Sequence, residues 1–167
     1  MSTMPDDAVE GAFDSAPTFA DAIRRAMRHA DERGARVLRW CDDDFAEWPL
    51  DDPEFLDHLT HWARGAAREL HLVAANYDVV RRRHARFTRW RQDFGHVITC
   101  LEPGEKHEDP LPTLWLDNAD QVVRVFDRER WRGRVGADRV DRQLAREMLD
   151  AITQRGTPAF GATTLGL

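Results

Sequence analysis

Residues 70–77, Leu-His-Leu-Val-Ala-Ala-Asn-Tyr, form a short apolar run that ends in a polar residue and a tyrosine. Such a run, bounded by turn residues, is typical of a strand covered on both faces of a sheet. A similar run lies upstream at 35–41, Ala-Arg-Val-Leu-Arg-Trp-Cys, and a third lies downstream at 96–101, His-Val-Ile-Thr-Cys-Leu. The segments that separate the three runs have apolar residues at helical spacing. This alternation predicts an α/β fold built on parallel strands.

The segments before the first two strands carry helix caps. Thr18 and Asp21 resemble a capping box, and Gly34 stands where a glycine ends a helix. A second helix is predicted after 52–54, where Asp-Pro-Glu supplies an N-cap, a first-turn proline and a first-turn acid. Both helices precede a predicted strand, which gives the alternation that α/β proteins require.

The second half of the chain predicts two more helices and a hairpin. A helix is expected over 77–93, followed by strands at 113–117 and 121–126 that Asn-Ala-Asp joins as a hairpin. Asp138 caps the last helix. The expected buried residues of these two helices are Val80, Phe87, Trp90 and Phe94 in the former and Val140, Leu144, Met148 and Ile152 in the latter.

These elements predict an α/β sandwich with a mixed β-sheet of about five strands flanked by helices. Residues 1–17 hold four acids and no base, which predicts a disordered acidic tail. A single α/β domain is then expected over 18–155, followed by a C-terminal tail at 156–167. A length of 167 residues with 42% hydrophobic and 32% charged residues fits one globular domain and excludes collagen-like and wholly disordered chains.

Charge and cysteine content narrow the class of partner. The formal net charge of -6 does not favour a general nucleic-acid binder, because phosphate affinity comes mainly from basic excess. The cysteines, Cys41 and Cys100, form no metal or redox motif and are expected as reduced thiols. The apolar runs are too short to predict a membrane partner, and the N-terminus lacks a secretory signal, so a cytoplasmic location is expected.

Polar residues follow each of the three predicted strands. In open α/β sheets, ligands bind outside the carboxyl ends of parallel strands. The alternative is that these residues are the ordinary loops and helix caps that all strand ends meet. On the first interpretation, the predicted ligand-binding residues are Asp42, Asp44, Trp48, Asn76, Tyr77 and His84.

An arginine-rich run covers 81–91, with six arginines in eleven positions. Arg83 and Arg86 are the predicted anion-binding residues, since guanidinium groups bind phosphates bidentately. The alternative is a solvated helix face whose arginines pair with acids. His84 borders the buried face of the same helix, where it is either a titrating site residue or a histidine bonded to a neighbour.

Other motifs of site chemistry are absent from the sequence. His58 and His61 have a spacing that two metal ligands can use, but no third ligand is recognisable, so no metal and no cofactor are expected. There is no G-x-G-x-x-G motif, P-loop or G-x-S-x-G motif. The basic loop 128–134 is expected at the surface, with contact to an anionic partner as the alternative.

The element order, and the phrase 70–77 leading into Arg83-His84-Ala85-Arg86-Phe87, resemble one repeat of the phospholipase D-like superfamily over about 37–152. More narrowly, the chain resembles uncharacterised proteobacterial proteins with that fold. The resemblance implies a bacterial protein with a phospholipase D-like sandwich. It also implies a homodimer, because active sites in that family form where two repeats meet.

The resemblance does not extend to the catalytic H-x-K-x4-D motif of the superfamily. Aligning its aspartate with Asp117 puts Pro110 and Pro112 at the histidine and lysine positions. Aligning it with Asp120 puts Thr113 and Trp115 there. No catalytic residue is therefore predicted from this motif.

The sequence thus favours a non-catalytic α/β protein that binds a small anionic ligand or a protein partner. One alternative is a divergent enzyme on a phosphorylated or nucleotide-like substrate, with His84 as acid or base. Another is anion or nucleic-acid binding through the 81–91 helix.

Overall fold

The computed structural model describes residues 11–104 and 109–161. The elements follow one another as β1 (Gly11–Asp14), α1 (Ala16–Arg33), β2 (Val37–Asp42), α2 (Pro53–Ala63), β3 (Glu69–Ala74), α3 (Asp78–Arg83), α4 (Ala85–Asp93), β4 (Ile98–Glu102), β5 (Leu114–Asp117), β6 (Val122–Asp127), β7 (Arg132–Gly136), α5 (Arg139–Thr153) and β8 (Thr157–Pro158).

The strands form one mixed sheet of eight, in the order β1-β7-β6-β5-β2-β3-β4-β8. The predicted strands β2, β3 and β4 are parallel neighbours, and β5 runs antiparallel to β2. The prediction of about five strands was wrong, because the segments that form β1, β7 and β8 have the sequence character of tails and loops. These strands are short and are defined by backbone pairing with distant segments rather than by an apolar pattern of their own.

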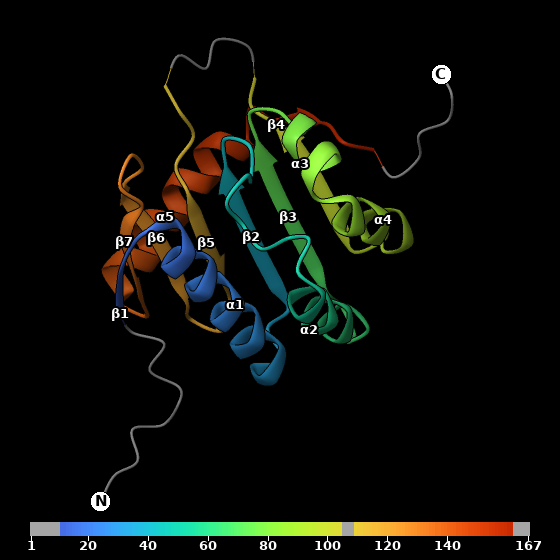
Figure 1. Cartoon of the computed structure of the whole chain (residues 1–167), viewed down its shortest axis with the longest axis horizontal. Helices are drawn as coiled ribbons and strands as arrows, with labels where there is room; N and C mark the ends of the chain where they lie inside the picture. The colour runs from blue at the N-terminus through green and yellow to red at the C-terminus, as the bar shows by residue number, and fades with distance from the viewer. Residues whose placement is uncertain (1–10, 105–108, 162–167) are drawn as a thin grey trace, which may run out of the picture.

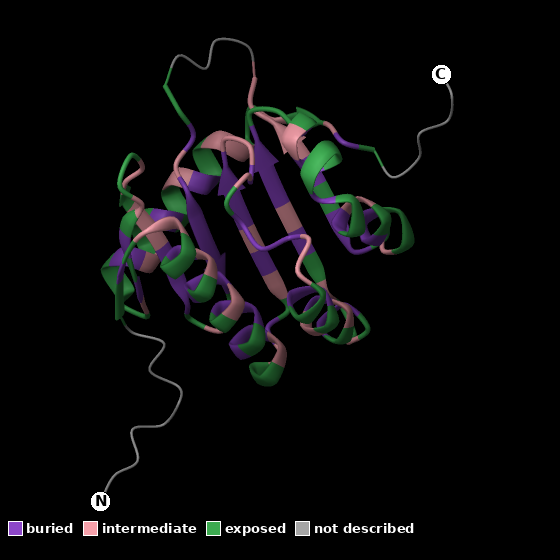
Figure 2. Cartoon of the chain, viewed as in Figure 1, coloured by how far each residue is buried: buried purple, intermediate pink, exposed green. Residues whose placement is uncertain are grey.

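Helices cover both faces of the sheet (Figure 1). Helices α1 to α4 lie on one face, and α5 lies on the other. The larger core lies under α1 to α4 and includes Trp40, Leu72 and Trp115, whereas the smaller core under α5 includes Cys41, Val73 and Leu149. Figure 2 shows β2 and β3 buried along most of their length. The continuous apolar runs of these strands therefore reflect burial on two faces, as predicted.

Helix α1 starts earlier than its predicted cap. Ser15 is the N-cap, and its Oγ accepts a hydrogen bond from the backbone N–H of Thr18 at 3.2 Å. The Thr18 hydroxyl in turn accepts the backbone N–H of Ser15 at 3.0 Å, so Thr18 is the third helical residue of the box rather than its cap. Gly34 ends the helix with φ of 65°, as predicted.

The predicted helix 77–93 is divided at His84, which has φ of -118° and ψ of 59°. Its ring Nε2–H donates a hydrogen bond to the backbone oxygen of Phe45 at 2.8 Å. The expected buried residues on both sides of the break, Val80, Phe87 and Trp90, do lie in the core. The division therefore keeps the predicted apolar face while turning His84 towards a distant loop.

The predicted apolar stripe of α5 was wrong for Val140 and Leu144 and right for Met148 and Ile152, which are partly buried against the smaller core. Val140 is 71% exposed and Leu144 is 36% exposed, whereas Asp141, Ala145 and Leu149 are the buried residues of this helix. Asp141 accepts a hydrogen bond from Arg134 on β7. This ion pair allows an acid to occupy the face that the helical period assigned to apolar residues.

The predicted N-terminal domain boundary falls inside α1, and the C-terminal one falls between α5 and β8. Residues 11–17, predicted as tail, form β1 and the start of α1, and Phe13 is only 5% exposed in the core. At the other end, β8 pairs with β4, and Phe160 is 6% exposed. Each of these two segments of polar or small residues carries one buried aromatic side chain. Residues 1–10 and 162–167 of the predicted tails lie outside the described residues.

Candidate functional site

Asp42, at the end of β2, is the centre of a buried network at the carboxyl edge of the sheet. Its Oδ1 accepts a hydrogen bond from Thr113 Oγ1 at 2.5 Å and forms an ion pair with Arg128, whose Nη1 lies 2.9 Å away. Its Oδ2 accepts the backbone N–H of Phe45 at 2.8 Å. Arg128 also lies 3.7 Å from Asp44 Oδ1. The network ties the end of β2 to the residues that precede β5 and follow β6.

The carboxyl group of Asp42 is closed to solvent. Burial raises its pKa above the usual value, and the charge of Arg128 and the hydrogen bonds from Thr113 and Phe45 lower it in part. The Arg128 side chain is 35% exposed, and its guanidinium lies 4.8 Å from the Trp131 ring centroid. A ligand at this edge would therefore meet Arg128 and not the carboxylate.

Asp42 and His84 meet through the backbone of Phe45. Phe45 has φ of 60°, a left-handed conformation that costs about 1–2 kcal/mol for a residue with a side chain. Its N–H is bound by Asp42 and its carbonyl by His84. His84 is 6% exposed, so it fixes this turn from within the core. Of the two roles that the sequence left open for His84, this geometry fits the one in which the ring is hydrogen-bonded to a neighbour.

The other predicted strand-end residues have separate surroundings. Trp48 is 2% exposed and packs against the rings of Phe45 and Trp40. Tyr77 is buried, and its hydroxyl donates to the backbone oxygen of Leu101 at 2.7 Å. Asn76 is exposed, and its Oδ1 accepts the backbone N–H of Asp78. Of the six predicted ligand-binding residues, four are therefore buried and in contact with neighbours, Asp44 is half-buried and Asn76 is exposed.

The start of β5 lies at the same edge as Asp42. Pro110 is exposed and Pro112 is half-buried, and Thr113 is bound to Asp42. The backbone N–H of Leu111 donates to Asp43 Oδ1 at 2.8 Å. In the alternative alignment, Trp115 is buried and its Nε1 donates to Asp117. These side chains anchor the edge, and none of those at the aligned histidine and lysine positions is a histidine or a lysine.

The predicted anion-binding arginines lie on exposed positions around His84. Arg83, at the end of α3, has no ion pair with another described residue. The guanidinium of Arg86 on α4 donates to the Asp51 backbone oxygen at 3.2 Å and lies 3.5 Å from its carboxylate. The charge of Arg86 is therefore partly neutralised by Asp51.

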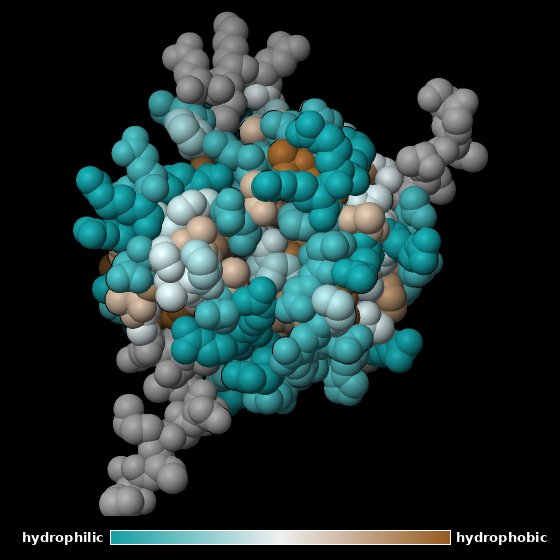
Figure 3. All heavy atoms as spheres, viewed as in Figure 1, coloured by the Kyte–Doolittle hydropathy of each residue, from teal (hydrophilic) through white to brown (hydrophobic). Residues whose placement is uncertain are grey.

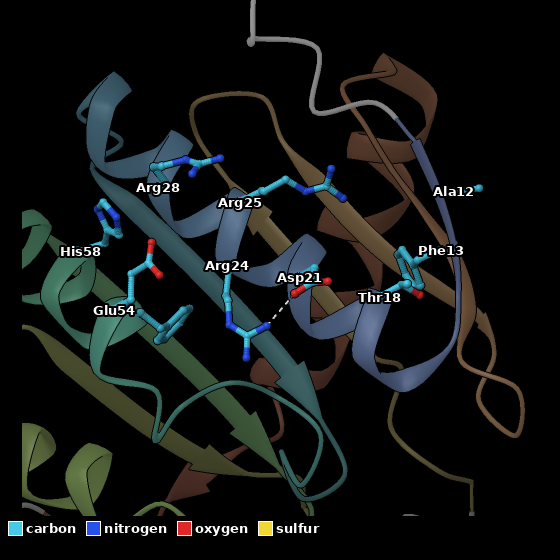
Figure 4. A pocket seen from close by; sticks show the side chains of 10 residues that line it. Ala12, Phe13, Thr18, Asp21, Arg24, Arg25, Arg28, Glu54 and His58 are labelled. Atoms are coloured by element: carbon cyan, nitrogen blue, oxygen red, sulfur yellow. Dashed lines mark hydrogen bonds and ion pairs between the residues drawn. The ribbon is translucent and has the colours of Figure 1, made fainter.

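A hollow of about 470 Å³ lies over α1, between β1 and α2. Figure 4 shows Arg24, Arg25 and Arg28 projecting from α1, with Glu54 and His58 on α2. The hollow is open and within the size range of small-ligand sites. Its wall combines the basic face of one helix with a second helix and a sheet edge (Figure 4).

The three arginines of the hollow differ in their partners. Arg24 binds Asp21 at 2.7 Å and Asp52 at 2.8 Å, so its charge is compensated. Arg25 and Arg28 are exposed and have no hydrogen bond or ion pair with another described residue. They stand three positions apart on one helix, which places their side chains on neighbouring turns. Two guanidinium groups without a partner in the described part of the chain therefore face the same hollow.

Neither the hollow over α1 nor the Arg128 network is predicted by the sequence. A signal for the hollow existed, because Arg24, Arg25 and Arg28 stand opposite the apolar residues Phe19 and Ile23 in the helical period. No comparable signal existed for Arg128, whose partner Asp42 belongs to a different and distant element.

Two absences concern the described residues alone. Over 11–104 and 109–161, no three or more His, Cys, Asp or Glu side chains are grouped to hold a metal ion. No helix in the same ranges has both the length and the apolar character needed to cross a membrane.

Comparisons with known proteins identify the fold but not a family. No protein-family model matches the sequence. No curated protein matches it either.

Three solved structures are similar to the chain. TrmBL2, described as an archaeal chromatin protein with a novel mode of DNA binding, superposes with a TM-score of 0.64 at 8% identity, over 95% of this chain and 56% of its own. NucT from Helicobacter pylori superposes with a TM-score of 0.56 at 7% identity, and the match covers 90% of this chain and 98% of NucT. Phosphatidylserine synthase from Haemophilus influenzae superposes with a TM-score of 0.59 at 9% identity, and the match covers 95% of this chain and 41% of the synthase.

NucT and the synthase share the α/β fold of this chain, a mixed sheet flanked by helices, which is the architecture that the resemblance to the phospholipase D-like superfamily implies. The chain spans only a little over half of TrmBL2 and less than half of the synthase. At these identities the likeness concerns the fold alone.

Proposed function

We propose that this protein is a phospholipase D-like module that binds nucleic acid without the H-x-K-x4-D chemistry, using the hollow over α1. The observation that carries the proposal is the pair Arg25 and Arg28, which are exposed, lack a partner among the described residues and face a hollow of about 470 Å³. Guanidinium groups in such a position bind phosphate oxygens by charge-assisted hydrogen bonds.

The surroundings of the pair favour a charged, hydrated partner. Figure 3 shows a face that is mostly hydrophilic, with small apolar patches. A polyanion that carries several phosphates can contact both arginines, and the helical spacing of three residues sets them on adjacent turns. Glu54 across the hollow opposes this attraction, so we expect moderate rather than tight binding.

Two further considerations support a binding role. The side chains at the strand ends are engaged with one another, above all Asp42 with Arg128 and Thr113. TrmBL2, whose fold is similar, is described as a DNA-binding chromatin protein, which weakens the sequence-based expectation that nucleic acid is not a partner. The net charge of -6 does not prevent local binding, because phosphate contacts depend on the charges that face the ligand.

We expect the double substitution Arg25→Glu/Arg28→Glu to weaken binding of a 30-base-pair DNA duplex by about 10- to 100-fold in low salt. Loss of two phosphate contacts should also reduce the slope of log K against log[salt] by about 2. Fluorescence anisotropy titrations at several salt concentrations measure both quantities. The same titrations with a single strand of equal length indicate which form is bound.

A matched control is available on the opposite face of the sheet. Arg139→Glu/Arg146→Glu on α5 changes the net charge equally at exposed positions and should leave the affinity within about twofold. A third variant, Arg83→Glu/Arg86→Glu, tests the arginine-rich helix predicted from the sequence. If that variant alone weakens binding, the interface lies on α3 and α4. If the unaltered protein shows no salt-dependent binding, the nucleic-acid proposal fails.

The remaining sequence-based expectations stay proposals. Homodimerisation, a cytoplasmic location and a bacterial origin follow from the resemblance or from the sequence. Sedimentation of the full chain measures the first directly. A small anionic ligand or a protein partner is the remaining binding function, and it is favoured if the duplex does not bind.

A further inference from the structure

A second hollow, of about 310 Å³, lies at the β4–β8 edge of the sheet. Arg91 of α4 lines it together with Cys100 of β4 and residues 158–161. Figure 1 shows α4 and the C-terminal segment on this side of the sheet, away from α1 and β1. The hollow is therefore distinct from the one proposed to bind nucleic acid.

Arg91 is a buried charge without a counter-ion among the residues that line this hollow. Arg91 as a whole is only 8% exposed. The Nε–H donates to the backbone oxygen of Phe160 at 3.2 Å, whereas the buried Nη1 has no hydrogen-bond partner within 11–104 and 109–161. None of the described residues that line the hollow is an acid. A buried cation without a paired anion destabilises the fold, because the charge has lost its hydration shell.

Cys100 does not supply the missing negative charge. Burial raises the pKa of its thiol to about 12, although the nearby Arg91 guanidinium lowers it in part. The thiol is therefore neutral at physiological pH and cannot neutralise Arg91. The hollow presents an unpaired cation beside a neutral sulfur atom and backbone groups.

The C-terminal wall of the hollow is held in place by several contacts. The Phe160 ring stacks on Tyr77 with centroids 5.1 Å apart, and the Arg81 guanidinium lies 5.0 Å from its ring centroid. The backbone N–H of Ala159 donates to the Cys100 oxygen at 2.9 Å. These contacts keep the Phe160 carbonyl on the Nε edge of Arg91, and a guanidinium has further N–H donors beyond that edge.

We propose that the hollow at Arg91, Cys100 and Phe160 binds a small oxyanion, with the Arg91 guanidinium as its principal donor. Phosphate, sulfate and carboxylate groups share the geometry that a guanidinium recognises. The site would take a free inorganic anion or the anionic group of a small metabolite. It does not depend on the nucleic-acid proposal, because no residue is shared by the two hollows.

The test uses inorganic phosphate, sulfate and acetate, each compared with sodium chloride at equal ionic strength. We expect a saturable rise of about 2–4 °C in the Tm of the full chain with at least one of them. Arg91→Gln should weaken the apparent affinity for that anion at least tenfold. Arg89→Gln, an exposed arginine on the same helix, should keep it.

The Arg25→Glu/Arg28→Glu variant separates this site from the first hollow. Its anion response should equal that of the unaltered chain if the anion binds at Arg91. Loss of the response in this variant, with retention in Arg91→Gln, would move the anion to α1 and overturn the proposal.

A second readout needs no substitution at Arg91. Cys100 lines the hollow, whereas Cys41 lies in the core under α5. Bound anion should slow alkylation of Cys100 by iodoacetamide at least threefold more than that of Cys41, as followed by mass spectrometry of peptides. Equal effects on both cysteines, or no saturable effect of any of the three anions, would overturn the proposal.

Discussion

Replacing Trp40 with alanine is expected to lower the free energy of unfolding by about 4 kcal/mol, within the range of buried Phe or Trp to Ala substitutions. Trp40 is fully buried on β2. Its ring stacks on Trp115 with centroids 5.3 Å apart and lies 5.7 Å from Trp48 and 5.8 Å from Phe55. The substitution would open a cavity among rigid rings that cannot close around it.

Urea denaturation followed by circular dichroism measures this change. Trp131→Ala is the matched control, because it removes the same side chain from a half-buried position against Phe19. We expect the control to lose less than half as much stability. Trp40→Phe should fall between the two and keeps the comparison possible if the alanine variant does not fold. Equal losses for Trp40→Ala and Trp131→Ala would contradict this account of the core.

The second large effect is expected at Asp42. Asp42→Ala should cost about 3–5 kcal/mol, because it removes one partner of a buried pair and leaves Thr113 and the Phe45 N–H without an acceptor. The left-handed backbone of Phe45 loses one of its two restraints in this variant. Asp42→Asn retains the volume and one acceptor oxygen, so its cost should be smaller.

Stability should also depend on pH through Asp42. Because burial raises its pKa in the folded state, the folded protein binds a proton that the unfolded chain has already released. This component of stability is therefore greatest below the unfolded pKa and decreases as pH rises through the folded pKa. Asp117, whose pKa is also raised by burial, has the same sign.

Denaturation of the unaltered chain, Asp42→Asn and Asp117→Asn between pH 4 and 8 separates the two contributions. Each substitution should remove its own part of the decrease. The pair with Arg128 is tested by Arg128→Gln and by the double variant with Asp42→Asn. The double variant should lose less stability than the sum of the single variants, because it leaves no unpaired charge. Additive losses and an unchanged pH profile would show that the pair does not act as a unit.

The sequence predicted the parallel centre of the sheet because β2, β3 and β4 carry their own signal. A run such as Leu70 to Ala74 is apolar throughout, and burial on both faces of a parallel strand requires that pattern. The buried face of the α3–α4 segment was also predictable, since Val80, Phe87 and Trp90 follow the helical period.

The helix α5 shows where a local pattern is insufficient. Two of its four apolar residues with helical spacing, Val140 and Leu144, are exposed. Asp141 is buried instead, and it is in contact with Arg134 on β7. Nothing in residues 138–153 encodes that contact. The same limit applies to the division at His84, which depends on a hydrogen bond to Phe45 in another loop.

The sequence by itself determined the α/β class, the three parallel strands and the absence of the H-x-K-x4-D motif, because each of these is contained in a short run of residues. Only the tertiary structure decided that Asp42 is closed by Arg128 and Thr113, that Arg25 and Arg28 face an open hollow, and that Arg91 is buried without a counter-ion among the residues beside it. The physical reason is that burial and ion pairing depend on which distant elements pack together, and the sheet order that brings them together is not a property of any single segment.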